Sequence, residues 1–304
     1  MFDLLEKADA TDLVLDGMRS ARLLVNGRWQ PTDVPFESER AMVEWVRDLL
    51  DGCGQRFDVA SPCADGYVDE GESRYRVHAV LGSTVTSRTQ VSVRRHRGEA
   101  PTLAGLVASG RMAGPTADGI RGVLARRESF LVSGSTGAGK TTLLAAALNE
   151  LQNERVIVIE DTPELAMSLP WVIGLNTRAP NVEGVGAVTA TDLVKQTLRM
   201  RPDRVTLGEV RGTEIAALAE ALASGHPGGG STIHAGSLEA VPVRLEGLLD
   251  QARLPQEVRE GLPQLIPWVF HLGQDSGVAR FEVGRLRLAA SGVLEVQNLA
   301  GASV

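Results

Sequence analysis

The stretch FLVSGSTGAGKTTLL, Phe130 to Leu144, carries the most specific structural signal in this chain. It opens with a short apolar run typical of a strand buried on both faces, and it leads into a helical segment. Its central part, GSTGAGKTT, follows the pattern G-x-x-x-x-G-K-[ST]. Glycines in this pattern let backbone N–H groups curl round phosphate oxygens without a side-chain clash. The order strand, loop, helix therefore predicts a site for a nucleoside triphosphate.

The positions of this loop have distinct expected roles. Lys140 supplies a cation to the β- and γ-phosphates, and Thr141 supplies a hydroxyl for Mg²⁺. The helix that follows points the positive end of its dipole at the anion. ATP and Mg²⁺ are thus the expected cofactors. The residues expected to line the nucleotide are Gly134, Ser135, Thr136, Gly137, Ala138, Gly139, Lys140, Thr141 and Thr142.

Acidic residues follow two further apolar runs, VIVI (156–159) and RVTL (204–207). The first run is followed by Glu160 and Asp161, and the second by Glu209. Parallel strands deliver such residues to a ligand at one edge of the sheet. One carboxylate would orient or deprotonate the attacking water, and Glu209 would hold Mg²⁺ through a water molecule. The alternative is that one of them caps a helix or pairs with Arg199, Arg201 or Arg204.

Composition and periodicity indicate an α/β protein. Hydrophobic residues make up 43% of the 304 residues and aromatic residues only 4%. Apolar runs alternate with helical patterns from Ser129 onward, which predicts a parallel-rich sheet with right-handed crossovers. Six glycines and two prolines between Gly98 and Gly122 predict a break in regular structure. We therefore expect an N-terminal domain over 1–100, a linker over 101–122 and a nucleotide-binding domain over 123–304.

The first hundred residues predict a small α+β domain. Asn26-Gly27 lies between apolar-rich flanks and indicates a two-residue hairpin. Met42, Val46 and Leu50 share one face of a helical pattern that stops at Gly52. Beyond it, the alternation around residues 75–81 and 91–93 predicts two half-buried strands.

Charge and cysteine content exclude several classes of protein. A net charge of −7 argues against a protein that coats nucleic acid, so no direct nucleic-acid contact is expected. Cys53 and Cys63 form neither a disulfide framework nor a zinc pair. The acidic N-terminus lacks signal-peptide character, and no apolar run approaches the about 18 residues of a membrane helix. We expect a cytoplasmic protein that contacts the membrane only through partners.

Two histidines flank a glycine run in SGHPGGGSTIHAG, Ser224 to Gly236. A metal site needs three or four convergent ligands, and no cysteine is near. An imidazole beside a γ-phosphate is a better use, because histidine changes charge in the physiological range. The glycines would let the loop reposition His234 when the phosphate leaves. For His226 two roles are open: a contact with the γ-phosphate, or a structural contact that braces the loop against a helix end.

Four motifs in this order resemble those of the type II/type IV secretion ATPases. GSTGAGKTT, VIVIEDTPEL, LRMRPDRVTLGEVRG and ASGHPGGGSTIHAGS are similar to the P-loop, acidic box, second-strand motif and histidine box of that superfamily. The segment NTRAPNVEGVGAVTATDLVKQTLRMRPDR resembles the branch that powers tight-adherence (Tad/Flp) pilus assembly.

The resemblance implies a RecA-like ATPase domain preceded by a PAS-like domain, in a homo-hexamer with ATP between the two. It makes Glu160 the water-activating base, Glu209 the support of the metal and His234 a contact of the γ-phosphate. Arg76 and Arg94, with Arg95 as a substitute, would reach the phosphates from the N-terminal domain. The alternative is that these arginines are solvated residues on edge strands.

The implied function is an ATP-hydrolysing motor for pilus assembly at the inner face of the cell membrane, with inner-membrane platform proteins as partners. An alternative is a conjugation or DNA-uptake ATPase of the same fold. A third reading is a nucleotide-gated scaffold that does not hydrolyse ATP, which the presence of both Glu160 and Glu209 disfavours. Whether the motor extends or retracts its fibre is left open.

Overall fold

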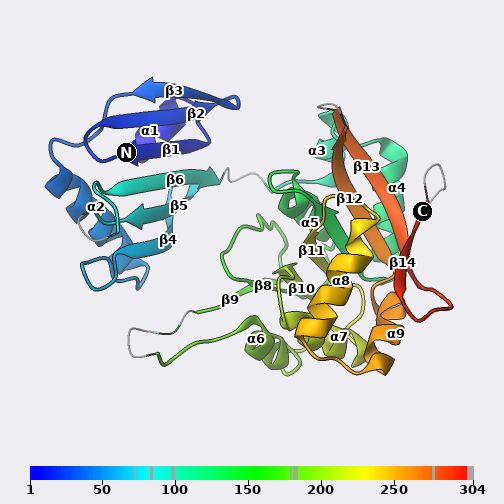
Figure 1. Cartoon of the computed structure of the whole chain (residues 1–304). Coiled ribbons are helices and arrows are strands. Elements are labelled where there is room, and N and C mark those ends of the chain that lie inside the picture. Colours follow the sequence, from blue (N-terminus) through cyan, green and yellow to red (C-terminus); the bar gives the residue numbers. More distant parts are fainter. Residues whose placement is uncertain are drawn as a thin grey trace. The chain divides into compact units, whose positions relative to one another are not determined.

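The computed structural model describes residues 1–71, 73–82, 85–96, 100–178, 180, 184–275 and 278–299. The chain forms two compact units, Met1–Glu99 and Ala100–Val304 (Figure 1). Among the described residues, no helix has the length and apolar character needed to cross a membrane.

The first unit is a six-stranded antiparallel sheet in the order β3-β2-β1-β6-β5-β4. Its helices, α1 (Phe2–Lys7) and α2 (Glu39–Gly52), share one apolar core with the sheet. Strand β5 alternates buried and more exposed side chains, as a half-buried strand should. The strands are β1 (Asp12–Asp16), β2 (Ser20–Val25), β3 (Arg28–Thr32), β4 (Cys63–Glu70), β5 (Ser73–Val80) and β6 (Gln90–His96).

The local signals in this unit are confirmed. Asn26 and Gly27 have φ of 50° and 74° between the paired strands β2 and β3, the left-handed pair that a two-residue hairpin needs. Helix α2 is capped by Ser38, whose Oγ accepts the N–H of Ala41, and it ends at Gly52. It buries Met42, Val46 and Leu50 on one face, as predicted.

The second unit contains an eight-stranded sheet in the order β14-β13-β12-β7-β11-β10-β8-β9. The neighbours from β12 to β9 are parallel, and β13 and β14 are added antiparallel at one edge, so the predicted parallel-rich sheet is confirmed. The strands are β7 (Phe130–Gly134), β8 (Val156–Glu160), β9 (Val172–Asn176), β10 (Arg204–Glu209), β11 (Gly230–His234), β12 (Trp268–Asp275), β13 (Val278–Leu288) and β14 (Leu294–Asn298).

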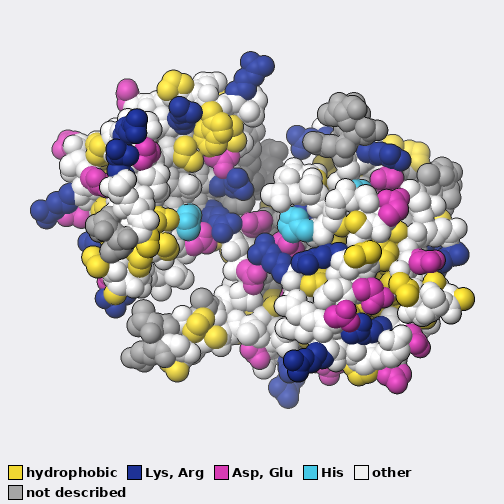
Figure 2. Space-filling model, viewed as in Figure 1, with side chains coloured by type: hydrophobic (Ala, Val, Ile, Leu, Met, Phe, Trp, Pro, Cys, Tyr) yellow, Lys and Arg dark blue, Asp and Glu magenta, His cyan; other side chains and the backbone are white. Residues whose placement is uncertain are grey.

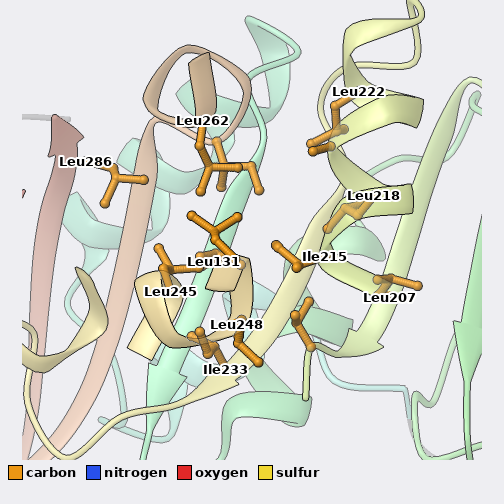
Figure 3. Packing of buried hydrophobic residues seen from close by; sticks show 14 of the residues in the cluster. Leu131, Leu207, Ile215, Leu218, Leu222, Ile233, Leu245, Leu248, Leu262 and Leu286 are labelled. Atoms are coloured by element: carbon orange, nitrogen blue, oxygen red, sulfur yellow. The ribbon is translucent and has the colours of Figure 1, made fainter. Parts of the chain in front are cut away.

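Helices cover both faces of this sheet. On one face α7, α8 and α9 pack against the strands, with Leu131 and Ile233 pointing into that core (Figure 3). On the other face α3, α4 and α5 pack against Phe130 and Val132, the neighbours of Leu131 in β7. Burial on both faces explains why the runs FLVS, VIVI and RVTL are continuous rather than alternating. The helices of this unit are α3 (Leu103–Ala108), α4 (Gly114–Ala125), α5 (Lys140–Leu148), α6 (Ala190–Thr197), α7 (Glu214–Ala223), α8 (Ala240–Gln251) and α9 (Gln256–Leu265).

The predicted break in regular structure over 101–122 is wrong. The segment holds α3 and most of α4, and both belong to the core of the second unit. Leu103 and Ile120 are fully buried, and each such side chain contributes about 1.5–3 kcal/mol. Pro115 lies in the first turn of α4, where proline is tolerated. Tertiary burial outweighs the weak helix propensity of the glycines here.

Candidate nucleotide site

The P-loop connects β7 to α5 and depends on glycine at three positions. Gly137 and Gly139 have φ of 78° and 92°, which side-chain-bearing residues rarely adopt. Gly134 has φ of 154°, and a Cβ there would lie 2.6 Å from the carbonyl oxygen of Leu272. The motif thus forms the predicted turn at the end of a buried strand, and α5 begins at Lys140 with its N–H groups facing the loop.

The parallel sheet brings the ends of β7, β10 and β11 together. His234 is opposite Gly134 in the pairing of β11 with β7, and Glu209 ends the neighbouring strand β10. Lys140 Nζ donates a hydrogen bond to the carbonyl oxygen of Ser135 at 2.9 Å and lies 3.2 Å from His234 Nδ1. His234 Nε2 lies 3.2 Å from Glu209 Oε1. Three of the predicted site residues therefore form one cluster beside the P-loop.

Lys140 is a buried cation with weak partners. The residue is only 7% exposed. Burial lowers the pKa of its ammonium group; the negative charge of Glu209 opposes this shift, and the positive charge of Arg211 adds to it. In the part of the chain that the structure describes, no carboxylate lies within ion-pair distance of Nζ. A buried ammonium is costly without a counter-charge, so this position favours an anionic ligand.

The carboxylate of Glu209 has one engaged oxygen and one orphaned oxygen. Oε2 accepts a hydrogen bond from Arg211 Nη2 at 2.7 Å. Oε1 is buried and has no hydrogen bond among the described residues, although His234 Nε2 lies 3.2 Å from it. Carboxylate oxygens and a threonine hydroxyl are hard donors of the kind Mg²⁺ prefers. The free oxygen of Glu209 is thus of the kind that suits a hydrated Mg²⁺, and the role of Thr141 in holding the metal stays a prediction.

Glu160 ends β8 and supports the loop that follows it. Its Oε1 accepts the backbone N–H groups of Glu164 and Leu165 at 2.9 and 3.0 Å. A Cβ at Gly208 would lie 2.8 Å from Glu160 Cγ, so glycine at 208 makes room for this side chain. These two bonds hold a loop and not a helix end, so they are not the helix cap weighed from the sequence. The role of Glu160 as water-activating base stays a prediction.

The three candidate arginines of the first unit are paired within that unit. Arg76 Nε donates to Asp65 Oδ1 at 2.9 Å, and Arg94 Nε donates to Asp12 Oδ1 at 2.7 Å. Arg95 Nε donates to Ser73 Oγ at 3.2 Å. A contact between any of these arginines and a phosphate stays a prediction.

The glycine run before His234 has a different use from the one expected. Residues 230–234 form the buried strand β11 and not a mobile loop. A Cβ at Gly229 would lie 1.9 Å from the carbonyl oxygen of Val205, and one at Gly230 would lie 2.6 Å from Phe130 Cζ. These two glycines permit close packing, and only Gly225 and Gly228 require a left-handed φ. His226 Nδ1 is buried without a hydrogen bond among the described residues.

Sequence reasoning missed two residues beside the site. Arg211 lies two positions after Glu209 and pairs with it; the only sequence signal is its place in GEVRG. His271 is buried on β12, opposite Ser133 of β7, with Nδ1 2.9 Å from the Ser133 hydroxyl oxygen. Burial lowers the pKa of His271. No sequence signal identified its strand.

A P-loop between a buried strand and a helix, with carboxylates and a histidine at the adjoining strand ends, defines a P-loop nucleoside triphosphatase. The sequence also matches the type II/IV secretion system protein family over residues 69–262, and the chain belongs to that family. Its relatives include a putative conjugal transfer protein of Mycobacterium tuberculosis. That protein is 38% identical over 300 residues, which cover 96% of this chain and 82% of the relative.

Solved structures show the same fold. The ATPase DotB of Legionella pneumophila matches with a TM-score of 0.69 and 18% identity, covering 96% of this chain and 80% of DotB. The pilus retraction motor PilT, solved with bound ADP, matches with a TM-score of 0.68 and 18% identity, covering 96% of this chain and 83% of PilT. The RecA-like fold and the secretion-ATPase superfamily predicted from the motifs are confirmed, and membership supports ATPase activity in general.

Basic and acidic side chains are interspersed on the face of each unit that Figure 2 shows. Together with the net charge of −7, this distribution gives no broad single-sign surface on that face. Binding of nucleic acid along its phosphates relies on such a basic surface.

Proposed function

We propose that the chain hydrolyses ATP with Mg²⁺ at the P-loop and uses the energy to drive a type II/IV secretion-type machine. The observation that carries this proposal is the buried ammonium of Lys140, which lies beside His234 and Glu209 and has no carboxylate within ion-pair distance among the residues that the structure describes. A buried cation at a helix start, with oxygen donors beside it, is suited to a nucleotide phosphate and its metal.

The residues would divide the work as follows. Backbone N–H groups of the P-loop and Lys140 hold the β- and γ-phosphates, while Thr141 and Glu209 hold the hydrated metal. Bound Mg²⁺ would neutralise charge that develops on the phosphates. Glu160 takes a proton from the attacking water or orients it. His234, which lies 3.2 Å from Lys140 Nζ, contacts the γ-phosphate and loses that contact when phosphate leaves.

The first unit would supply a further cation. We propose that Arg76 or Arg94, with Arg95 as a substitute, approaches the phosphates in a homo-hexamer whose nucleotide lies between the two units. To do so, Arg76 must leave Asp65 and Arg94 must leave Asp12, their present partners at 2.9 and 2.7 Å. A cation that arrives only on closure stabilises the transition state and not the resting state.

The machine we favour is a pilus assembly system at the inner face of the cell membrane, with membrane platform proteins as partners. The Tad-like segment between β9 and β10 and the fold shared with PilT support this choice. A second candidate is conjugal transfer, which the name of the M. tuberculosis relative favours. The acidic balance supports a motor that acts on protein partners without touching DNA.

Phosphate release by the purified full chain with Mg-ATP tests the enzymatic proposal. We expect release that disappears in Lys140→Ala and Glu209→Gln. Nucleotide binding without release would instead support the non-hydrolysing scaffold. Single-stranded DNA added to the same assay separates the two machines: stimulation favours conjugal transfer, and no effect favours pilus assembly.

A further inference from the structure

Arg211 places a guanidinium group between the two acidic strand ends of the second unit. Its Nη2 donates to Glu209 Oε2 at 2.7 Å, and its Nη1 lies 3.7 Å from Asp161 Oδ2. Glu209 is the last residue of β10 and Asp161 comes directly after β8, and these two strands are neighbours in the sheet. One arginine therefore joins the carboxylates of two strand ends beside the P-loop.

The backbone of Arg211 is held while its side chain is exposed. The N–H groups of Arg211 and Gly212 both donate to Glu214 Oε1, at the start of α7. The side chain of Arg211 is 62% exposed, whereas that of Glu209 is 19% exposed. Rotation of the guanidinium away from Glu209 would thus leave the backbone of the loop and the carboxylate in place.

The position of this guanidinium matters because it engages the carboxylate that fits the metal. One oxygen of Glu209 is bound to Arg211, and the other, 3.2 Å from His234 Nε2, has no hydrogen bond within the described residues. A guanidinium cannot be deprotonated under ordinary conditions, so it satisfies Glu209 at any physiological pH. A hydrated divalent ion carries twice its charge, and it competes for the same carboxylate oxygens.

We propose that Arg211 is a resident cation of the Glu209–Asp161 pair, and that hydrated Mg²⁺ entering with nucleotide displaces it from Glu209. The inference rests on the proposed Mg-ATP site. Arg211 acts here as a positioning residue: it keeps Glu209 oriented before the metal arrives, and it raises the Mg²⁺ concentration at which the nucleotide complex forms.

The test is binding of a fluorescent ATP analogue to the purified full chain, titrated with Mg²⁺ at fixed nucleotide. We expect Arg211→Gln to lower the half-saturating Mg²⁺ concentration by about threefold to tenfold, because the competing cation is gone. Arg211→Lys keeps the charge without the planar fork, so its value should fall between the native chain and Arg211→Gln.

Arg121→Gln is the matched control. Arg121 also joins two carboxylates of the second unit, those of Asp118 and Glu150, at 2.9 and 3.0 Å. Its loss removes the same charge and should leave the Mg²⁺ requirement unchanged.

The outcomes separate this inference from the proposed function. If the native chain shows no Mg²⁺-dependent binding of the analogue, the proposed Mg-ATP site is wrong. If the native chain binds in that way but both Arg211 variants need as much Mg²⁺ as it does, or more, the displacement is wrong and the proposed function stands. Circular dichroism melts identify a variant that fails to fold. If Arg211→Gln fails to fold, the Mg²⁺ requirement of Arg211→Lys tests the displacement.

Discussion

Two buried cations of the second unit differ in their partners: within the described residues, one is paired with a carboxylate and the other is not. Arg204, 1% exposed at the start of β10, donates two hydrogen bonds to Glu154 at 2.7 and 2.8 Å. It also donates to the carbonyl oxygens of Leu124 and Gly228, each at 2.8 Å. Lys140, 7% exposed, contacts the carbonyl oxygen of Ser135 and the ring of His234, and no other hydrogen-bond partner is found in the described ranges.

The partners of these two side chains distinguish a charge that stabilises the fold from a charge that serves a ligand. The guanidinium of Arg204 donates four hydrogen bonds and connects the end of α4, the loop before β11 and the carboxylate of Glu154, so it contributes to the stability of the fold. The ammonium of Lys140 is desolvated without a matching anion, which is unfavourable until a ligand supplies one. Burial alone does not distinguish the structural role of Arg204 from the functional role of Lys140. The hydrogen-bond and ion-pair partners of each side chain do.

The largest expected effect tests the functional side of this comparison. Lys140→Ala should lower phosphate release by about 10²-fold or more, because the cation facing the transferred phosphoryl group is lost. The free energy of unfolding without nucleotide should hold or rise, since a desolvated charge is removed. Steady-state phosphate release and urea unfolding measure the two. A large loss of stability with modest loss of activity would reverse our assignment.

The opposite pattern is expected for Arg204. Arg204→Ala should lower the free energy of unfolding by about 3–5 kcal/mol, because Glu154 loses its bidentate partner and two carbonyl groups lose their donor. Arg127 lies 3.2 Å from Glu154 and offsets part of this loss, which places the effect at the lower end of the range. Arg204→Lys, which retains the charge but not the fork, is the control and should lose less. A change below about 1 kcal/mol in urea unfolding would contradict the structural role.

The third effect concerns the histidine beside Lys140. His234→Ala should lower kcat by about 10- to 100-fold and change nucleotide affinity by less than about threefold, because the contact matters only as the γ-phosphate departs. Single-turnover hydrolysis and equilibrium binding of a fluorescent nucleotide separate the two quantities. His226→Ala serves as comparison, since His226 belongs to the same motif but, within the described part of the chain, forms no hydrogen bond or ion pair with Lys140 or Glu209. Equal losses of kcat and affinity would argue against a sensor.

How much of this could be predicted from the sequence follows from the range of the interactions. The P-loop is contiguous, and the runs FLVS, VIVI and RVTL carry their own burial signal, so their strands and the carboxylates after them were predictable. Helix α4 was not, because Gly119 and Pro115 lower the local propensity and only packing against the core restores the helix.

Strand β11 was missed for a related reason. Gly229 and Gly230 indicate a flexible loop locally, and their need for a bare Cα appears only when Val205 and Phe130 are placed against them. The pairing of Arg211 with Glu209 was missed because it depends on how the loop after β10 turns, which Glu214 fixes through backbone hydrogen bonds. Long-range packing and loop geometry are the parts that a single sequence does not carry.

The smallest expected effect concerns a buried base that, like Lys140, lacks a full counter-charge. Burial lowers the pKa of His271 from its ordinary 6.5; Glu282 and Glu239 oppose this and Arg280 adds to it. The unfolded chain therefore binds this proton at a higher pH than the folded chain does. As pH falls through 6.5 toward the folded pKa, the unfolded state gains protons first, and the stability that His271 preserves above 6.5 is lost.

His271→Gln should flatten that acid loss, because glutamine keeps a polar group near Ser133 but does not titrate. Urea midpoints at pH values on both sides of 6.5 measure the slope. His78→Gln, at a half-exposed histidine of the first unit, is the control and should leave the slope of the second unit unchanged. Equal slopes for the native chain and His271→Gln would mean that the imidazole is protonated alike in both states. The burial of His271 would then not oppose its protonation. In that case the hydrogen-bond and ion-pair partners of a buried side chain would not predict the free energy of charging it in this unit.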